Sequence, residues 1–266
     1  MPFGYVSPEQ QMRDKADYAR KGIARGRSVV VLQYEDGILF VAPNPSRALH
    51  KISEIYDKIG FAAVGRYNEF EALRLGGIRY ADINGYTYAR DDVTARGLAN
   101  LYAQNLGQIF TESLKPFEVE IVVAEVGDSS DEDHIYRLTF DGSVFDEAGL
   151  VAMGGQAETV AARLKERYRD GLSLTEALEA ALFALTEPGG ERFPANQLEV
   201  AVLDRNRPHR KFLRLNGPRL ERLLAEGAPA AEPAAKTGGE NPLSAPETPG
   251  APPTAPDGDI DTGSSG

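Results

Sequence analysis

One lysine of this sequence stands where it could do chemistry. Lys51 lies in HKISEIYDKIGFAAVG, residues 50 to 65, at the start of a short apolar run that ends on a glycine. A lysine at such a position can be a catalytic amine, an anchor for a carboxylate or an ordinary surface charge. The plainest of these is a strand-end lysine that snorkels and pairs with an acid. What Lys51 faces therefore separates an enzyme from a binding protein.

Other sets of reactive residues carry weaker signals. Gly154 and Gly155 lie between a predicted strand and a predicted helix, the setting of a phosphate loop. However, GxGxxG and GxxxxGK[ST] are absent, and such glycines more often serve backbone geometry. The acidic run DSSDED at 128 to 133 lacks the glycine and the terminal glutamate of a calcium loop, which favours a solvated hairpin loop. No GxSxG elbow or Ser, His and Asp set stands out.

Composition excludes several functional classes. The 266 residues hold no cysteine, so a disulfide, a thiol nucleophile or a thiolate metal site is impossible. The three histidines, His50, His134 and His209, lie far apart, and we expect neither a metal nor a cofactor. The net charge of −11 argues against nucleic-acid binding. No run approaches the roughly 18 apolar residues of a membrane span, and no secretion signal opens the chain, so we expect a cytoplasmic protein without a membrane partner.

The chain divides into a short leading segment, one domain and a tail. Residues 1 to 7 are uncharged and precede the first predicted helix. Residues 8 to 226 form the predicted domain, and a hydrophobic content of 42% over the chain suffices for a core. From residue 227 onward Pro, Ala and Gly dominate, and six acids against one lysine give a net −5. We expect this acidic tail, 227 to 266, to be disordered.

The first helix has a clear start. Ser7 is the predicted N-cap, Pro8 occupies the first helical position and Gln10 completes a capping box. An apolar stripe then ends between 22 and 26; its members are Met12, Ala16, Ala19 and Ile23. The stripe can pack on its own domain or on a neighbouring subunit.

Strand runs and helix pairs follow one another in the rest of the domain. The predicted strands are 28–34, 38–42, 50–59, 60–65, 118–126, 135–140, 150–154, 198–203 and 212–215. Turns at Asp36-Gly37 and Asp141-Gly142 suit hairpins. Helices are predicted from about 67, from 91 or 92, over 159–168, from a capping box at 173–176 to 185, and through 224. This order predicts an α+β fold, a four-layer αββα sandwich of two antiparallel sheets.

Four segments, in this order and spacing, resemble a proteasome α-subunit. They are SPEQ at 7 to 10, EDGILFVA at 35 to 42, HKI with IGFAAVG at 50 to 65, and LEVAVL at 198 to 203. The form is most similar to the non-catalytic subunit of the actinobacterial 20S core particle, a member of the threonine peptidase family of proteasomes, and the likeness covers about residues 3 to 225. The resemblance implies the N-terminal-nucleophile hydrolase fold with an extra N-terminal helix.

The resemblance implies no catalytic residue. Catalytic proteasome subunits cleave with an N-terminal threonine whose own amine is the base. Alignment on the glycine at 37 places Arg27 at that threonine, and Pro43 and Pro45 at or near its supporting residues. We therefore expect a structural and gating subunit of a threonine-type endopeptidase. A self-processing N-terminal-nucleophile hydrolase is the alternative, although no Thr precedes the first hairpin.

The resemblance gives Lys51 a docking role. It matches the lysine that activates the nucleophile in catalytic subunits, and in α-rings it forms the floor of a pocket between adjacent subunits. A partner's C-terminal carboxylate would bind there. Gly65 and Arg66, at the start of the following helix, would add a backbone N–H or a second cation at the same pocket.

The partners implied by the resemblance are the other α-subunits of a seven-membered ring, the β-subunits, and a hexameric proteasomal ATPase or an ATP-independent activator. Substrates tagged with prokaryotic ubiquitin-like protein would be partners only indirectly.

Two segments are expected to line the path of the substrate. The expected gate comprises Met1, Pro2, Phe3, Gly4, Tyr5, Val6 and Ser7, with Pro8 as its hinge. The loop Thr111, Glu112, Ser113, Leu114 and Lys115 is similar in position to the pore constriction of α-rings. A plain connection from a helix to a strand is the alternative for this loop.

Overall fold

The computed structural model describes residues 7–227. The predicted gate residues Met1 to Val6 and the tail from 228 to 266 lie outside the described residues. In chain order the helices and strands are α1 (Pro8–Ile23), β1 (Val29–Tyr34), β2 (Gly37–Pro43), β3 (Ile52–Tyr56), β4 (Ile59–Gly65), α2 (Tyr67–Thr87), α3 (Ala95–Glu112), β5 (Val119–Glu125), β6 (His134–Leu138), β7 (Val144–Asp146), β8 (Leu150–Met153), α4 (Ala157–Arg167), α5 (Leu174–Leu185), β9 (Leu198–Asp204), β10 (Phe212–Leu215) and α6 (Gly217–Glu226).

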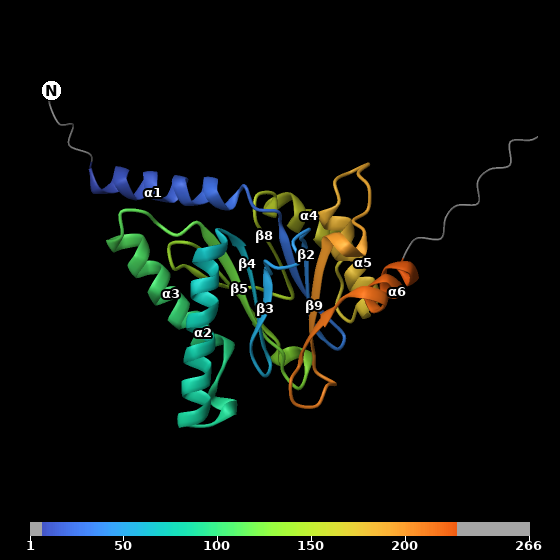
Figure 1. Cartoon of the computed structure of the whole chain (residues 1–266). Helices are drawn as coiled ribbons and strands as arrows, with labels where there is room; N and C mark the ends of the chain where they lie inside the picture. Colours follow the sequence, from blue (N-terminus) through green and yellow to red (C-terminus); the bar gives the residue numbers. More distant parts are fainter. Residues whose placement is uncertain (1–6, 228–266) are drawn as a thin grey trace, which may run out of the picture. The chain divides into compact units, whose positions relative to one another are not determined.

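The domain has four layers, as predicted. One sheet has the strand order β10-β9-β2-β1-β8 and the other the order β3-β4-β5-β6-β7, and all pairs are antiparallel. Helices α2 and α3 cover the outer face of the second sheet, α4 and α5 that of the first, and α1 runs across one end of the sandwich (Figure 1). The predicted αββα sandwich is confirmed.

Both faces of the first sheet are buried, which explains its nearly continuous apolar strands. In β1, Val30 and Leu32 pack toward α5, whereas Val29 and Val31 pack into the core between the sheets. The side chains alternate because successive residues of a strand point to opposite faces. Residues of the second sheet complete the middle core on one face and contact α2 and α3 on the other.

Helix α1 packs on its own domain. The hydroxyl of Ser7 accepts a hydrogen bond from the Gln10 amide at 3.2 Å, as an N-cap should. The Gln10 side chain instead donates to Asp14 at 2.8 Å, so the second half of the predicted capping box is not formed. Ala19 and Ile23 are buried in the core between the sheets. The C-terminal half of the predicted stripe therefore holds α1 against the sandwich.

The first hairpin turns one residue earlier than predicted. Tyr34 pairs with Gly37, so Glu35 and Asp36 form the turn. Gly37 opens β2 with a φ of +147°, and a Cβ there would overlap the carbonyl oxygen of Leu203 in β9. The glycine is thus required by the close approach of two strands rather than by a primed turn.

One helix start and one strand differ from the sequence predictions. Helix α3 begins at Ala95 with Thr94 as its N-cap, because Asp91 and Asp92 belong to a separate short 3-10 helix, Arg90–Asp92. Strand β7 was not predicted, since its three residues are all exposed and carry no alternating pattern. The predicted capping box at 173 to 176 is confirmed at the start of α5.

Candidate functional site

Lys51 lies immediately before β3, the edge strand of the second sheet. Its carbonyl oxygen accepts a hydrogen bond from the Ala63 amide of β4 at 3.0 Å, which fixes it beside the end of that strand. Its ammonium donates to the carbonyl oxygen of Arg27 at 2.9 Å, in the segment between α1 and β1. Within residues 7–227 this ammonium has no carboxylate at ion-pair distance, so the arrangement is not that of a surface lysine paired with an acid.

The surroundings of Lys51 weaken its hold on a proton. Burial lowers the pKa of Lys51 from its ordinary value of 10.5 to about 8; the charge of Glu199 opposes this change, and that of Arg27 adds to it. The ammonium is half-buried and is bonded to a neutral oxygen. An arriving carboxylate would supply the ion-pair partner that this ammonium lacks among residues 7–227.

Gly65 and Arg66 lie at the same end of the β3–β4 pair as Lys51. Gly65 has a φ of +117°, and a Cβ there would overlap the carbonyl oxygen of Glu118. The Arg66 guanidinium lies 3.1 Å from the buried Glu118 carboxylate, and its amide donates to the Glu118 carbonyl at 3.0 Å. The predicted second cation is therefore already paired and is less available than Lys51.

The expected constriction loop begins at the C-terminus of α3. Leu114 is fully exposed, at 101% of its reference area. The Lys115 ammonium forms ion pairs with the buried carboxylates of Glu69 and Glu118, at 2.5 and 3.0 Å. Lys15 of α1 donates to the carbonyls of Phe110 and Thr111 at 3.0 and 3.3 Å, which ties the first helix to this loop. Of the five loop residues, Leu114 is the one that presents a large apolar side chain to solvent.

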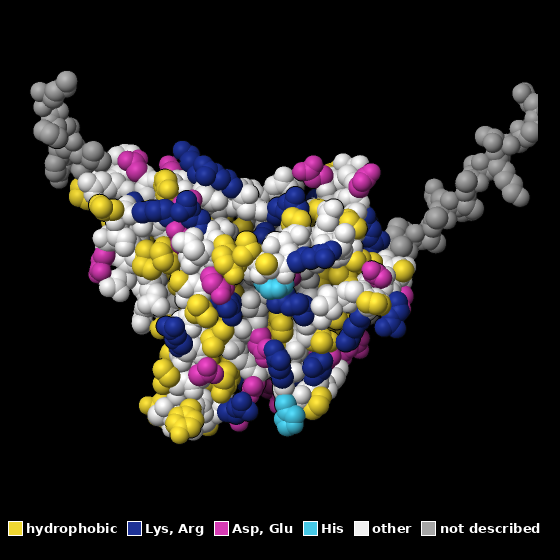
Figure 2. All heavy atoms as spheres, in the orientation of Figure 1, with side chains coloured by type: hydrophobic (Ala, Val, Ile, Leu, Met, Phe, Trp, Pro, Cys, Tyr) yellow, Lys and Arg dark blue, Asp and Glu magenta, His cyan; other side chains and the backbone are white. Residues whose placement is uncertain are grey.

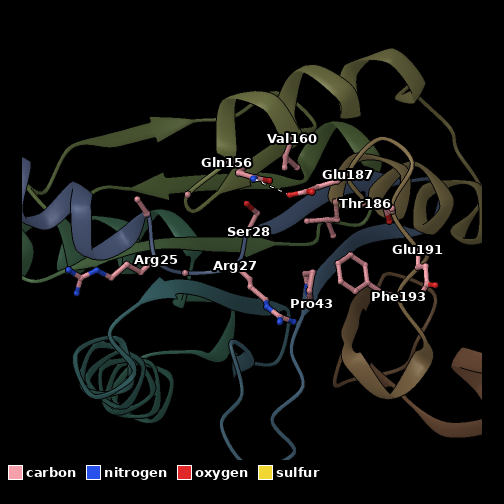
Figure 3. A pocket seen from close by; sticks show the side chains of 15 residues that line it. Arg25, Arg27, Ser28, Pro43, Gln156, Val160, Thr186, Glu187, Glu191 and Phe193 are labelled. Carbon is pink, nitrogen blue, oxygen red and sulfur yellow. Dashed lines mark hydrogen bonds between the residues drawn. The ribbon is translucent and has the colours of Figure 1, made fainter.

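A cavity of about 450 Å³ opens beside the residues that match the nucleophile and its supports. Arg27, Ser28 and Pro43 line it on one side, and Gln156 and Thr186 on the other (Figure 3). Because Lys51 also binds the Arg27 carbonyl, the structure brings together three positions that the resemblance assigned to a catalytic site. Arg27 carries no hydroxyl, and its nitrogen is part of a peptide bond. Pro45 is exposed and does not line the cavity.

The glycine pair before α4 serves backbone geometry. The Gly154 amide donates to the Glu120 carboxylate and the Gly155 amide to the Gly26 carbonyl, each at 3.3 Å. A Cβ on Gly155 would overlap the carbonyl oxygen of Ala24. Because both amides are already bonded, the phosphate-loop alternative gains no support.

The acidic run between β5 and β6 is only partly solvated. Residues 128 to 132 are exposed, as expected. Asp133 is not: its side chain is 2% exposed, and it pairs with Arg205 at 2.8 Å and accepts a hydrogen bond from Gln33 at 2.9 Å.

The described residues contain no group of three or more His, Asp or Glu that could hold a metal ion. Nor does any helix between 7 and 227 have the length and apolar character to cross a membrane.

Sequence reasoning missed the buried glutamates around the site. Glu69, Glu118 and Glu199 are each at most 7% exposed, and each holds a loop or a strand end through its carboxylate. A glutamate within an apolar strand, as in LEVAVL at 198 to 203, is the signal that could have indicated such a residue.

Two antiparallel sheets between helical layers, with a helix ahead of the first strand, define a class: the N-terminal-nucleophile hydrolase sandwich, in a form whose nucleophile position is internal to the chain. The family model described as proteasome subunit matches residues 23–203. The chain therefore belongs to the proteasome subunit family.

Curated relatives define the type within that family. A chain named "Proteasome subunit alpha" from Streptosporangium roseum is 86% identical over 100% of this chain and 99% of its own length. Relatives of the same name from Thermomonospora curvata and Thermobifida fusca are 72% and 68% identical; they align with 86% and 85% of this chain, and over 99% and 91% of their own lengths. The chain is an α subunit of the actinobacterial 20S proteasome core, as the four sequence segments predicted.

Proposed function

We propose that this α subunit is a non-catalytic ring component of cytoplasmic protein degradation. Seven copies would form an outer ring that templates and caps a ring of catalytic β-subunits. The ring would gate substrate entry and dock the C-termini of a hexameric ATPase or an ATP-independent activator. Support comes from the arginine at the nucleophile position, which leaves the chain without the terminal Thr that this class of hydrolase needs.

The observation that carries docking is the state of Lys51. Its ammonium is half-buried, bonded to the Arg27 carbonyl oxygen and unpaired with any acid of the described chain. A terminal carboxylate is compact enough for such a point charge. Lys and Arg side chains also lie along α1, among acidic ones (Figure 2).

The gate proposal concerns residues 1 to 7. The chain enters α1 through Ser7, which caps the helix, and Pro8, which occupies its first turn. Displacement of the leading segment would pivot at Pro8, because a proline there keeps α1 intact while the residues before it move. Substrates tagged with prokaryotic ubiquitin-like protein would reach the pore only through the ATPase.

The exposed Leu114 supports a constriction role for the loop 111 to 115. An unfolded chain passing a ring of such side chains would meet apolar contacts without a fixed sequence requirement. Lys115, which is paired with two acids, would anchor the loop rather than touch the substrate.

The test of docking is Lys51→Ala in particles assembled with β-subunits. Activator-stimulated protein degradation should fall to the level without activator, while small-peptide cleavage by the same particles stays near the native rate. Lys58→Ala is the matched control, because Lys58 lies in the turn of the same β3–β4 pair and is ion-paired with Glu125 at 2.9 Å. Full stimulation of the Lys51→Ala particle would refute the docking role.

The alternative function, a self-processing hydrolase, is tested by the purified chain alone. Peptide hydrolysis without β-subunits, with native mass measured on the same sample, would overturn the non-catalytic assignment.

A further inference from the structure

Glu199 is the most heavily bonded side chain next to Lys51, and nothing in the docking proposal uses it. It lies on β9 and is 6% exposed. Its carboxylate accepts hydrogen bonds from Asn44 Nδ2 at 2.7 Å, the Lys51 amide at 2.9 Å, the Ile52 amide at 3.2 Å and Arg214 Nη1 at 2.6 Å, and it lies 3.1 Å from His50 Nδ1. A buried carboxylate with this many donors has a fixed position.

The carboxylate joins the two sheets at one end. Glu199 belongs to the first sheet, and its neighbours two and four residues on, Ala201 and Leu203, face the core between the sheets. Its partners Lys51 and Ile52 lie at the start of β3 in the second sheet. The start of β3 in one sheet is thereby attached to the start of β9 in the other.

Side chains of the first sheet bind the free edge of β3, where no further strand pairs. Strand β3 is an edge strand, and Ile52 at its start pairs with β4 on one side. Ile52 gives its amide to Glu199, and its carbonyl oxygen accepts a bond from Arg214 Nη2 at 2.7 Å. The Glu199–Arg214 ion pair thus satisfies both backbone groups of Ile52 and fixes the direction in which the chain leaves Lys51.

The loop before Lys51 is also hydrogen-bonded to the Glu199 carboxylate. Asn44, 8% exposed, donates to Glu199 and also to the Leu49 carbonyl at 2.8 Å. Its side-chain oxygen accepts the Ser46 amide at 3.0 Å. The chain from 44 to 52 therefore wraps around one buried negative charge, and Lys51 leaves this loop toward Arg27.

We propose that Glu199, with Arg214, is a positioning residue for the docking of C-terminal carboxylates: the pair clamps the backbone at Lys51 and Ile52, aims the Lys51 ammonium and helps to keep it charged. This inference rests on the proposed docking function. Glu199 does not touch the docked carboxylate. It acts through the lysine, whose burial it offsets electrostatically.

The first experiment needs no partner. The lysines of the assembled full-length chain are [¹³C]methylated, and the Lys51 resonance is assigned by its absence from the NMR spectrum of Lys51→Arg. The pH titration of this resonance is then followed in the native chain and in Glu199→Gln. Removing the negative charge should lower the pKa of Lys51 below its native value of about 8. Glu125→Gln is the matched control: Glu125 is also 6% exposed and binds a backbone amide, that of Ala95, and a lysine, Lys58. An unchanged titration in Glu199→Gln would refute the inference.

The second experiment separates charge from position. Binding of a synthetic peptide with a free C-terminal carboxylate, and of its C-terminally amidated form, is measured at pH 6 and pH 8.5. If the pKa falls by about one pH unit, the protonated fraction at pH 8.5 drops roughly eightfold and at pH 6 by less than about 1.2-fold. Glu199→Gln should therefore weaken carboxylate binding far more at pH 8.5 than at pH 6. An equal loss at both values would mean general loosening of the site and would overturn the electrostatic half of the proposal.

Arg214→Lys tests the positional half and remains available where Glu199→Gln does not fold. It keeps the cation near Glu199 but cannot bond to both Glu199 and the Ile52 carbonyl in the same planar geometry. We expect peptide binding to weaken by the same several-fold factor at both pH values. Native affinity in Arg214→Lys would refute the clamp. Native peptide affinity in Lys51→Ala would instead refute docking at Lys51, whatever the titration of Lys51 shows.

Discussion

Docking at Lys51 should depend on pH in a range where ordinary lysines stay charged. With a pKa of about 8, Lys51 is about 90% protonated at pH 7 and about 10% at pH 9, whereas a lysine at its ordinary value is still about 97% protonated at pH 9. Carboxylates bind the ammonium and not the neutral amine. The affinity for a free C-terminus should therefore fall about tenfold for each pH unit above 8, until the pKa of the complex is reached.

The assay is fluorescence anisotropy of a labelled C-terminal peptide on the assembled ring between pH 6 and pH 9.5. The control is Lys51→Arg, because a guanidinium stays protonated throughout this range. Its binding can be weaker, since the geometry differs, but it should not change between pH 7 and pH 9. Constant affinity of the native ring over that interval, or the same decline in Lys51→Arg, would contradict the reasoning.

The same titration affects folding with a definite sign. The pKa of Lys51 is lower in the folded chain than in the unfolded chain, so the unfolded state binds more protons between pH 8 and pH 10.5. The cost of the buried ammonium is present in full below pH 8 and is relieved as the pH rises through this window. Occupation of the site by a carboxylate would remove part of that cost and would raise the pKa of Lys51 in the complex above its value in the free site, so docking and proton binding at Lys51 are coupled.

Two further predictions concern other parts of the chain. Deleting residues 2 to 7 should raise peptide hydrolysis by assembled particles without activator, because the leading segment would no longer close the pore; unchanged hydrolysis would argue against the gate. Asp133→Ala leaves Arg205, 11% exposed, without its 2.8 Å partner and should lower the free energy of unfolding by about 3–5 kcal/mol in urea titrations. Asp131→Ala in the same loop, at an exposed position, should change it by less than about 0.5 kcal/mol; equal effects would contradict the buried pair.

Local signals in the sequence were sufficient for most helices and strands. The capping box at Ser173 and Glu176 involves residues only three apart, so the sequence alone could predict it. The structure confirms it at the start of α5. Gly37 was misassigned because the reason for a glycine lies in β9, far along the chain: the carbonyl of Leu203 leaves no room for a Cβ. Strand β7 carries no apolar alternation, since all three of its residues are exposed.

The hydrogen-bond partners of Lys51 could not be predicted from the sequence. The likeness to α-subunits indicated Lys51, yet its partners are the Arg27 carbonyl, 24 residues away, and the Glu199 carboxylate, 148 residues away. Neither contact follows from a local pattern. The same holds for Arg66, which was expected as a possible second cation: the structure pairs it with Glu118 beside the end of β4, and no local pattern predicts that pair.

Lys51 also connects the docking proposal with the gate. Its ammonium binds the carbonyl of Arg27, in the segment between α1 and β1, and the other end of α1 leads into residues 1 to 7. An ammonium has three donors, so a carboxylate can bind beside the Arg27 carbonyl or compete with it. Either event changes the hydrogen bonding of the segment that follows α1, and the middle of α1 is bonded to the C-terminus of α3, where the expected constriction loop begins, through Lys15. If α1 moves as a rigid body, a shift at Arg27 would be carried along the helix to Pro8.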